Sequence, residues 1–189
     1  MKIALTGAMG CGKSATRNAF ELAGAKVLDA DKLAHNVLET DKDVIEKVKA
    51  LLGNDVYFAD GKPDRAKIAS QVFSDSQKLH TLEEIIHPAI KKIWDCQDST
   101  NDVVVVEVPL LFEKKLENDF DICVSVYCSQ ALRIKRLIQR GMTPSEISKR
   151  DAFQFSATEK AKLADIVLFN EGILEFLNTQ VAFVLSRLK

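Results

Sequence analysis

The sequence predicts an α/β fold in which a doubly wound parallel sheet of about five strands forms the middle of three layers. Two observations carry this prediction. Short apolar segments rich in Val and Ile alternate with longer segments of helical periodicity. Strands that are separated by helices need crossover connections, and such connections make neighbouring strands parallel. The expected strands are residues 3–6, 26–28, 103–108, 122–127 and 166–169.

Each element has its own local signal. Residues 3–6 end in a glycine and lead into a helix that starts at Lys13 and that Gly24 should stop. Residues 103–108 read VVVVEV, and such a β-branched run is typical of a strand buried on both faces. The other strands are shorter apolar runs, and a last helix is expected over residues 174–188.

Composition limits the class of protein. The 189 residues are 47% hydrophobic with a net charge of −1, which predicts one compact domain with room for an insertion. The charge argues against a nucleic-acid-binding protein, and no apolar run approaches the roughly eighteen residues of a membrane span. The four cysteines are scattered and no signal peptide is visible. We therefore expect a cytoplasmic protein with reduced thiols, either a monomer or a weak homo-oligomer.

Two stretches interrupt the alternation of strands and helices. Residues 33–95 are helical in pattern and too long for an ordinary crossover, so they are interpreted as a helical insertion. Residues 141–158 contain capping boxes at Thr143–Glu146 and at Ser156–Glu159, which is typical of short helices in a mobile lid. The predicted organisation is a core, the insertion and the lid, with the core made of residues 1–32, 96–140 and 159–189.

The segment between the first strand and the first helix reads GAMGCGKS and matches the pattern G-x-x-x-x-G-K-S. Its glycines let the backbone curl so that N–H groups point at phosphate oxygens, and the helix N-terminus adds a positive dipole end. Lys13 would reach the β- and γ-phosphates, and the Ser14 hydroxyl would ligate Mg²⁺. The alternative interpretation of this motif is a glycine-rich turn that binds no ligand, and the Gly-Lys-Ser at this offset between a strand and a helix argues against it. The sequence therefore predicts a P-loop NTPase core that binds ATP and Mg²⁺ through Gly7, Ala8, Met9, Gly10, Cys11, Gly12, Lys13, Ser14 and Ala15.

Other motifs narrow the class of nucleotide-binding protein. The guanine-reading motif Asn-Lys-x-Asp is absent, and Pro109–Glu113 occupies the place of a DxxG switch. A short chain with an insertion after the second strand and a lid after the fourth is similar to nucleoside-monophosphate-type kinases of small molecules. Another metabolite kinase, and a nucleotide-dependent switch that hydrolyses ATP alone, remain alternatives.

Further short motifs follow the phosphate loop in a consistent order, namely Asp29-Ala30-Asp31, Arg65 before Ile68 and Phe73, His87-Pro88, Pro109–Glu113, Gln154, Ala164-Asp165 and Asn170-Glu171-Gly172. From Ile3 to about Gly172 the chain resembles the dephospho-CoA kinase family. The resemblance implies ATP-dependent phosphorylation of the ribose 3′-hydroxyl of dephospho-CoA, the last step of coenzyme A synthesis, with the insertion binding the acceptor. The chain departs from the family's usual residues at Ala8, Cys11, Ala15, Glu107 and Phe169, and Phe169 places the adenine contacts in doubt.

Two acids are candidates for chemistry. Asp31 follows the second strand, at the end of the sheet where open α/β folds bind ligands, and could orient or deprotonate the acceptor hydroxyl. Its alternative role is a helix N-cap, and Asp29 is the less favoured catalytic twin. Glu107 ends a buried strand and could hold Mg²⁺ through water; a tolerated charge at the end of a strand is equally compatible.

Three arginines are spaced three and four apart after Ser129, so Arg133, Arg136 and Arg140 share a helix face that leads into the lid. Charge on the transferring phosphoryl group must be neutralised, and Arg136 and Arg140 are the preferred catalytic arginines, with Arg150 third. A solvated basic face is the alternative.

The remaining acceptor-binding candidates, besides Asp31, are Arg65, His87 and Leu110. Arg65 could grip the acceptor's phosphates or form a surface salt bridge. The pair His87-Pro88 is more readily explained as a turn.

Cys11 lies inside the phosphate loop beside inward-pointing N–H groups and a helix N-terminus. These groups favour a thiolate, so an exposed Cys11 would be redox-sensitive. A small residue that merely fits the loop is the favoured alternative.

Overall fold

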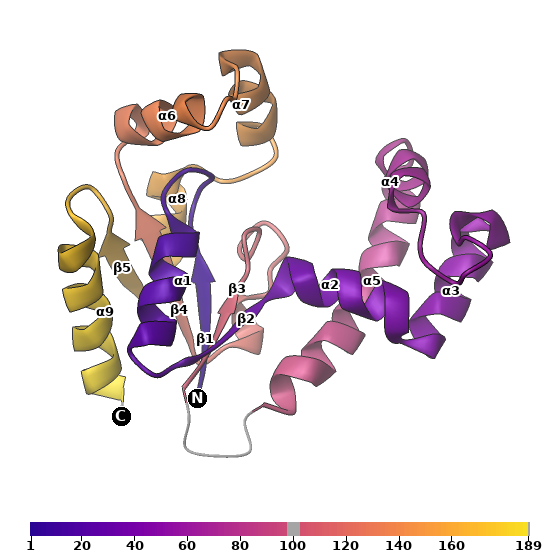
Figure 1. Ribbon diagram of the computed structural model, residues 1–189, viewed down its shortest axis with the longest axis horizontal. Helices are drawn as coiled ribbons and strands as arrows, with labels where there is room; N and C mark the ends of the chain where they lie inside the picture. Colours follow the sequence, from indigo (N-terminus) through magenta and orange to yellow (C-terminus); the bar gives the residue numbers. More distant parts are fainter. Residues whose placement is uncertain (98–102, 189) are drawn as a thin grey trace. The chain divides into compact units, whose positions relative to one another are not determined.

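The computed structural model describes residues 1–97 and 103–188. It contains a five-stranded sheet of order β2-β3-β1-β4-β5 (Figure 1). β1 pairs in parallel with β3 and β4, and β4 pairs in parallel with β5. The predicted parallel sheet is confirmed, with strands β1 (Lys2–Thr6), β2 (Lys26–Asp29), β3 (Val104–Glu107), β4 (Ile122–Tyr127) and β5 (Ile166–Phe169).

The chain divides into two compact units. The first contains Met1–Leu28 and the chain after Gln97, and the second contains Asp29–Gln97. The phosphate loop and the predicted lid (residues 141–158) belong to the first unit, whereas the predicted insertion (residues 33–95) falls inside the second.

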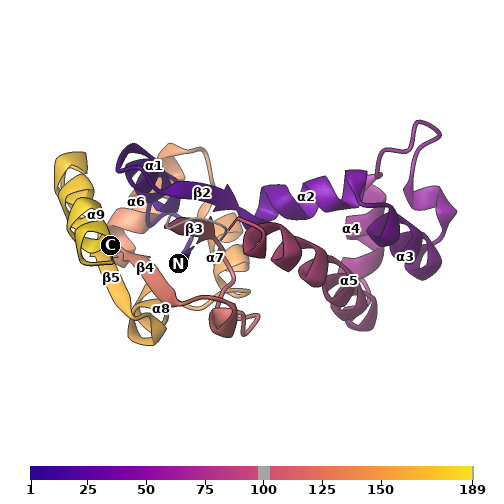
Figure 2. The same cartoon turned by 90° about the horizontal axis from the view of Figure 1, so that it is seen from below.

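Helices cover both faces of the sheet in the first unit, which confirms the three-layer prediction. Helix α1 (Lys13–Leu22) packs on α9 (Leu174–Leu188), and α8 (Ala157–Leu163) packs on β4. Figure 2 shows α1 and α9 on one side of the strands and α8 on the other. The two remaining helices of this unit are α6 (Gln130–Gln139) and α7 (Pro144–Asp151), and a 3₁₀ turn, η2, spans Glu117–Asp119.

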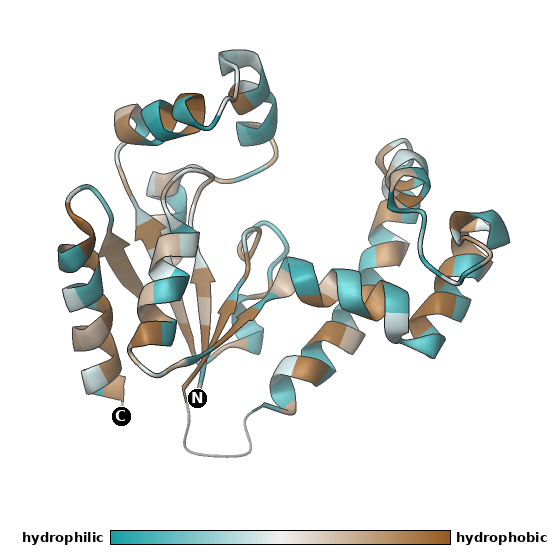
Figure 3. Cartoon of the chain, viewed as in Figure 1, coloured by the Kyte–Doolittle hydropathy of each residue, from teal (hydrophilic) through white to brown (hydrophobic). Residues whose placement is uncertain are grey.

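The hydrophobic core explains why the strands are where the sequence places them. β3 is buried along its whole length, because it lies between β2 and β1 with helices on both faces. In Figure 3 the strands are among the most hydrophobic segments, whereas the helices alternate along their length. The central residues of the core are fully buried: Ile3, Leu5, Val105, Val124 and Val126.

Both predicted capping boxes are confirmed. The Thr143 hydroxyl accepts a hydrogen bond from the Glu146 N–H at 3.3 Å, and the Glu146 carboxylate accepts one from the Thr143 N–H at 2.8 Å. Ser156 and Glu159 form the same reciprocal pair at the start of α8. Each box supplies partners for N–H groups that a helix start leaves unpaired.

The second unit is helical, with a small core of its own. Its helices are α2 (Ala30–Thr40), α3 (Lys42–Leu52), α4 (Arg65–Phe73) and α5 (Ser76–Asp95), with the 3₁₀ turn η1 at Asn54–Val56. Each α-helix starts after an aspartate whose side chain accepts from the first turn, namely Asp29, Asp41, Asp64 and Asp75. Buried side chains on facing helices, among them Val48, Ile68, Leu82 and Trp94, hold the unit together.

The turn expected at His87-Pro88 is wrong, because helix α5 continues through Pro88. Proline removes one N–H from the helix ladder and crowds the preceding turn. Buried residues on both sides of it, Leu82 before and Ile90 after, keep the helix packed on its neighbours. Tertiary packing here outweighs the local preference.

Candidate active site

The phosphate loop connects the end of β1 to the start of α1 and fits tightly among its neighbours. Gly12 has φ of 98°, and a Cβ atom placed there would lie 2.0 Å from Asn170 Nδ2. A Cβ atom at Gly10 would lie 2.9 Å from both Arg133 Cγ and Leu137 Cγ. Both positions therefore require glycine, for space as well as for backbone conformation.

Every carbonyl oxygen of residues 7–12 accepts a hydrogen bond from the protein itself. The donors, in chain order of the carbonyls, are Lys13 Nζ (2.9 Å), the Cys11 N–H (3.1 Å), Arg133 Nη1 (3.3 Å), Cys128 Sγ (3.9 Å), Asn170 Nδ2 (2.8 Å) and the Thr16 N–H and hydroxyl (both 3.1 Å). Three of the six donor residues, Arg133, Cys128 and Asn170, lie more than a hundred positions from the carbonyl that they bind. The curl of the loop is thus fixed from outside.

Three of the loop's N–H groups have the opposite character. Among the described residues, none accepts a hydrogen bond from the N–H of Gly10, Gly12 or Ser14. These groups lie at the positive end of the α1 dipole, and the ammonium group of Lys13 rests 2.9 Å from the Gly7 carbonyl. Unpaired N–H groups at a helix N-terminus are the elements of an anion site.

Arg136 adds a second positive group beside the loop. Its Nη1 atom is buried and has no hydrogen-bond partner within the described residues, and it lies 4.0 Å from the position a Cβ atom would take on Gly12. A buried guanidinium N–H without an acceptor carries an energetic cost that an anionic ligand can remove. Of the three arginines expected on one helix face, Arg136 is the one with a buried donor beside the loop that has no partner within the described residues.

The other two arginines have different surroundings. Arg140 is exposed at the end of α6, as is Arg150 near the end of α7. Arg133 is buried and forms a two-pronged ion pair with Asp151 (2.8 and 2.5 Å). The hydrogen bonds with Asp151 raise the pKa of Arg133. Neither Arg133 nor Asp151 was given a role from the sequence. Only residues three or four apart meet on one helix, and these two are eighteen apart and lie on different helices.

The oxygen groups expected to hold Mg²⁺ have a suitable chemistry. The Ser14 side chain is exposed at the start of α1. Glu107 lies at the end of β3, in register with Leu5 of β1, and its carboxylate is 3.3 Å from Arg17 Nη1. Hydroxyl and carboxylate oxygens suit Mg²⁺, which keeps several waters and phosphate ligands rather than occupying a closed protein cage. In agreement, the described residues contain no cluster of three or more His, Cys, Asp or Glu that could hold a metal.

Asp31 lies in the first turn of α2, but it is not the cap of that helix. Asp29 is the N-cap, and its carboxylate accepts from the Lys32 N–H at 3.2 Å. The alternative role considered for Asp31 is therefore wrong. Its exposed carboxylate belongs to the second unit, like the other acceptor candidates on α4 and α5.

Arg65 and His87 have different surroundings within the second unit. Arg65 forms a half-exposed ion pair with Glu39 at 3.6 Å, the salt bridge that was its alternative role. His87 packs edge-on against Trp94 inside α5, with ring centroids 5.9 Å apart. Leu110 is partly exposed in the turn after β3, within the first unit.

Cys11 is completely buried, so it lacks the exposure on which the redox-sensitive alternative depends. Its side chain contacts that of Cys128. Burial is the main cause that raises the pKa of Cys128 to about 12, and the contact with Cys11 is the second. The structure therefore favours the alternative that Cys11 is a small residue that fits the loop.

A buried ion pair fixes the segment that follows β3. Lys160 of α8 is fully buried, and its Nζ donates to the Pro109 carbonyl at 2.6 Å and to Glu113 at 2.9 Å. Glu113 also accepts from the Phe155 N–H at 2.6 Å. Burial lowers the pKa of Lys160, against the opposing effect of Glu113. Sequence reasoning missed this pair because a lysine in a short polar helix usually faces water.

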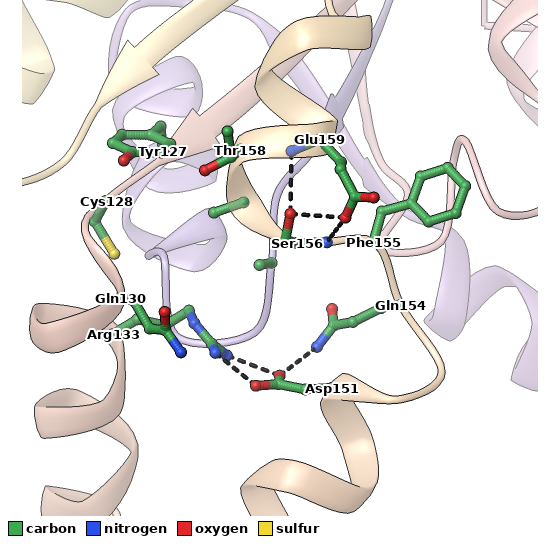
Figure 4. A pocket seen from close by; sticks show the side chains of 12 residues that line it. Tyr127, Cys128, Gln130, Arg133, Asp151, Gln154, Phe155, Ser156, Thr158 and Glu159 are labelled. Carbon is green, nitrogen blue, oxygen red and sulfur yellow. Dashed lines mark hydrogen bonds and ion pairs between the residues drawn. The ribbon is translucent and has the colours of Figure 1, made fainter.

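A pocket of about 500 Å³ lies between the phosphate loop and the lid. Figure 4 shows Tyr127 and Cys128 on one side, Ser156, Thr158 and Glu159 on another, and the Arg133–Asp151 pair along a third side. Tyr127 also touches Phe169, the ring that stands where the resembling family has aspartate, with centroids 5.7 Å apart.

Comparison with known proteins assigns the chain to a family. The family model for dephospho-CoA kinase matches residues 1–175. A dephospho-CoA kinase from Aquifex aeolicus is 37% identical over 99% of this chain and 97% of that protein. A dephospho-CoA kinase structure from Campylobacter jejuni is 26% identical, with a TM-score of 0.72 over 99% of this chain and 97% of that one.

More distant structures share only the fold. The shikimate kinase from Acinetobacter baumannii is 16% identical, with a TM-score of 0.53 over 98% of this chain and 93% of that one. Within residues 1–97 and 103–188, no helix combines the length and apolar character that crossing a membrane requires.

The match of the family model and of the relatives over nearly the whole chain leads to one conclusion: this protein belongs to the dephospho-CoA kinase family.

Proposed function

We propose that this kinase transfers the γ-phosphoryl group of ATP, with Mg²⁺, to the ribose 3′-hydroxyl of dephospho-CoA. The observation that supports it most is the phosphate loop, whose carbonyls are all bonded to the protein while the N–H groups of Gly10, Gly12 and Ser14 are left for a ligand. An ATP-binding loop of this kind, in a chain of this family, fits the transfer of phosphate to a small molecule.

The roles of the loop residues follow from their positions. Lys13 exchanges the Gly7 carbonyl for phosphate oxygens, and Arg136 gives its unpaired Nη1 to the same group. Ser14 and Glu107 would hold Mg²⁺, which would supply positive charge beside the phosphates of ATP. Arg140 completes the positive surroundings when the lid closes.

The acceptor is the second half of the proposal. Asp31 orients the hydroxyl and accepts its proton, a role left open by Asp29, which already caps α2. Arg65 binds an acceptor phosphate in exchange for its exposed partner Glu39, and His87 and Leu110 line the acceptor's path. We further propose that the protein acts in the cytoplasm on small molecules as a monomer or weak homo-oligomer.

A coupled assay of ADP release tests the proposal. Purified protein is given ATP and Mg²⁺ with dephospho-CoA, AMP, shikimate or no acceptor, and the product is checked by mass and by position of the phosphate. We expect ADP release only in the reaction that contains dephospho-CoA as the acceptor, and we expect the product to carry the new phosphate on its 3′ oxygen. Release with AMP or shikimate only would indicate another metabolite kinase, and equal release without acceptor would indicate a nucleotide-dependent switch.

A further inference from the structure

Met9, Arg133, Asp151 and Gln154 form a closed ring of hydrogen bonds between the phosphate loop and the lid. Figure 4 shows the last three of these residues and the bonds between them. Arg133 donates to the Met9 carbonyl at 3.3 Å and to both oxygens of Asp151 at 2.8 and 2.5 Å. Gln154 donates to Asp151 at 3.2 Å, and its own oxygen accepts from the Met9 N–H at 3.3 Å. Both polar groups of the Met9 backbone are therefore held by side chains from elsewhere in the chain.

Charge makes this ring more specific than a neutral one. The Arg133 side chain is only 8% exposed and that of Asp151 31%, so the arginine depends on the carboxylate as its counter-charge. A planar guanidinium that meets a carboxylate with two parallel hydrogen bonds is fixed in angle as well as in distance. Asp151 is the last residue of α7, so the pair fixes the end of this lid helix against α6.

The same arginine touches the loop at a second point. Its Cγ atom lies where any side chain on Gly10 would have to go, and Leu137 closes the same space. A displacement of Arg133 would therefore move Met9 and Gly10 together. The N–H of Gly10 is one of the groups that face the phosphate site, so the shape of that site depends on the ring.

We propose that Arg133, Asp151 and Gln154 are positioning residues for ATP: they set the phosphate-binding shape of the loop at Met9 and Gly10 and join it to the lid. The inference rests on the proposed function. All three line the pocket between the loop and the lid, but the role proposed for them is indirect, because the donors of Arg133 are directed to Asp151 and to the Met9 carbonyl. ATP affinity, rather than acceptor affinity, should depend on the ring.

The decisive variant removes the ring without leaving a buried charge. Replacing a buried ion pair by apolar residues of similar size is often neutral for stability, so the double variant Arg133→Met/Asp151→Leu should melt close to the parent. The Met9 carbonyl nevertheless loses its donor. We expect the Kd of Mg·ATP and its KM to rise about tenfold, the size expected for one charge-assisted hydrogen bond, while the KM of dephospho-CoA stays within about twofold.

Two single variants accompany it. Asp151→Asn should raise the KM of ATP in the same way but also lower the melting temperature, since it leaves the Arg133 charge unpaired. The matched control is Asp43→Asn, which breaks an exposed ion pair with Lys47 (2.7 Å) in the other unit and should change neither constant.

Equilibrium binding of Mg·ATP is measured besides turnover, so the result does not depend on the identity of the acceptor. A double variant that melts like the parent and binds Mg·ATP like the parent would overturn the inference, and the pair would be structural only. Equal increases in both KM values would overturn it too. A parent that binds Mg·ATP but does not phosphorylate dephospho-CoA would instead refute the proposed function.

Discussion

Replacing Glu113 by Gln should destabilise the protein by about 3–5 kcal/mol, because it leaves the Lys160 ammonium buried without its counter-charge. Lys160 is fully buried, and its Nζ lies 2.9 Å from the Glu113 carboxylate. Glutamine keeps an oxygen for the Phe155 N–H, and the Pro109 carbonyl still accepts from Lys160, so the change removes charge with little change in shape. The substitution therefore isolates the electrostatic part of this contact.

The predicted loss of stability can be converted into a shift of the melting temperature. In a chain of this length, 1 kcal/mol corresponds to about 2–4 °C in melting temperature, so Glu113→Gln should melt about 6–20 °C below the parent. The double variant Glu113→Gln/Lys160→Met replaces the pair by neutral groups of similar volume and should melt close to the parent. The difference between the single and double variants measures the coupling.

The pH dependence has a defined sign. Burial lowers the pKa of Lys160, so the unfolded chain binds more protons than the folded one between that lowered pKa and the ordinary value of 10.5. Stability attributable to this group therefore rises with pH in that window. Without Glu113, which raises the pKa of Lys160, the window widens, and the deficit of Glu113→Gln should shrink in alkaline buffer.

Thermal unfolding followed by circular dichroism, with urea titration at neutral and alkaline pH, measures these quantities. A single variant that melts within about 2 °C of the parent would show that Lys160 is not a desolvated charge. A double variant less stable than the single one would show that packing, not charge, dominates this contact.

Three further predictions concern the site, and a fourth concerns the pH dependence of stability. Lys13→Ala should lower turnover by about 10² to 10³ at unchanged melting temperature, and a loss under threefold would exclude the loop as the catalytic phosphate site. Asp31→Asn should lower turnover far more than ATP affinity and leave stability unchanged, since Asp31 caps no helix. Calorimetry measures the ATP affinity and melting curves the stability, and a turnover equal to that of the parent would rule out the catalytic role of Asp31. Gly12→Ala should weaken Mg·ATP binding, because its Cβ atom would meet Asn170 at 2.0 Å, and an unchanged Kd would contradict the tight fit. Burial raises the pKa of Cys123 from 9.0 to about 11, so stability should fall as pH rises through this range, and Cys123→Ala should flatten that part of the curve in urea titrations.

Local and periodic features could be predicted from the sequence. The run at residues 103–108 predicted a strand buried on both faces, and the Ser/Thr-x-x-Glu patterns predicted two helix starts, because both depend on residues close together in the chain. The phosphate loop has the same property. Its eight residues, read between an apolar run and a helical pattern, predict a strand-to-helix turn.

Features that depend on distant partners could not be predicted in this way. The spacing of the three arginines predicts a shared face, but only tertiary structure gives Arg133 a carboxylate and leaves Arg136 Nη1 without a partner among the described residues. His87-Pro88 was wrongly expected to form a turn, because the packing that maintains α5 comes from other helices. The burial of Cys11 and Lys160 has the same origin.

The phosphate loop itself shows both kinds of dependence. Its motif supplies N–H groups, a lysine and a serine, but three of the bonds that fix its curl come from Arg133, Cys128 and Asn170. A carbonyl without its donor would be free to rotate, and the N–H that follows it in the same peptide unit would rotate with it. Each outer donor therefore controls the direction of one inner N–H: Arg133 controls that of Gly10, and Asn170 that of Gly12. Two chains with identical phosphate-loop motifs can thus differ in ATP affinity through residues that never touch the nucleotide, and in this chain those residues lie on α6, after β4 and after β5.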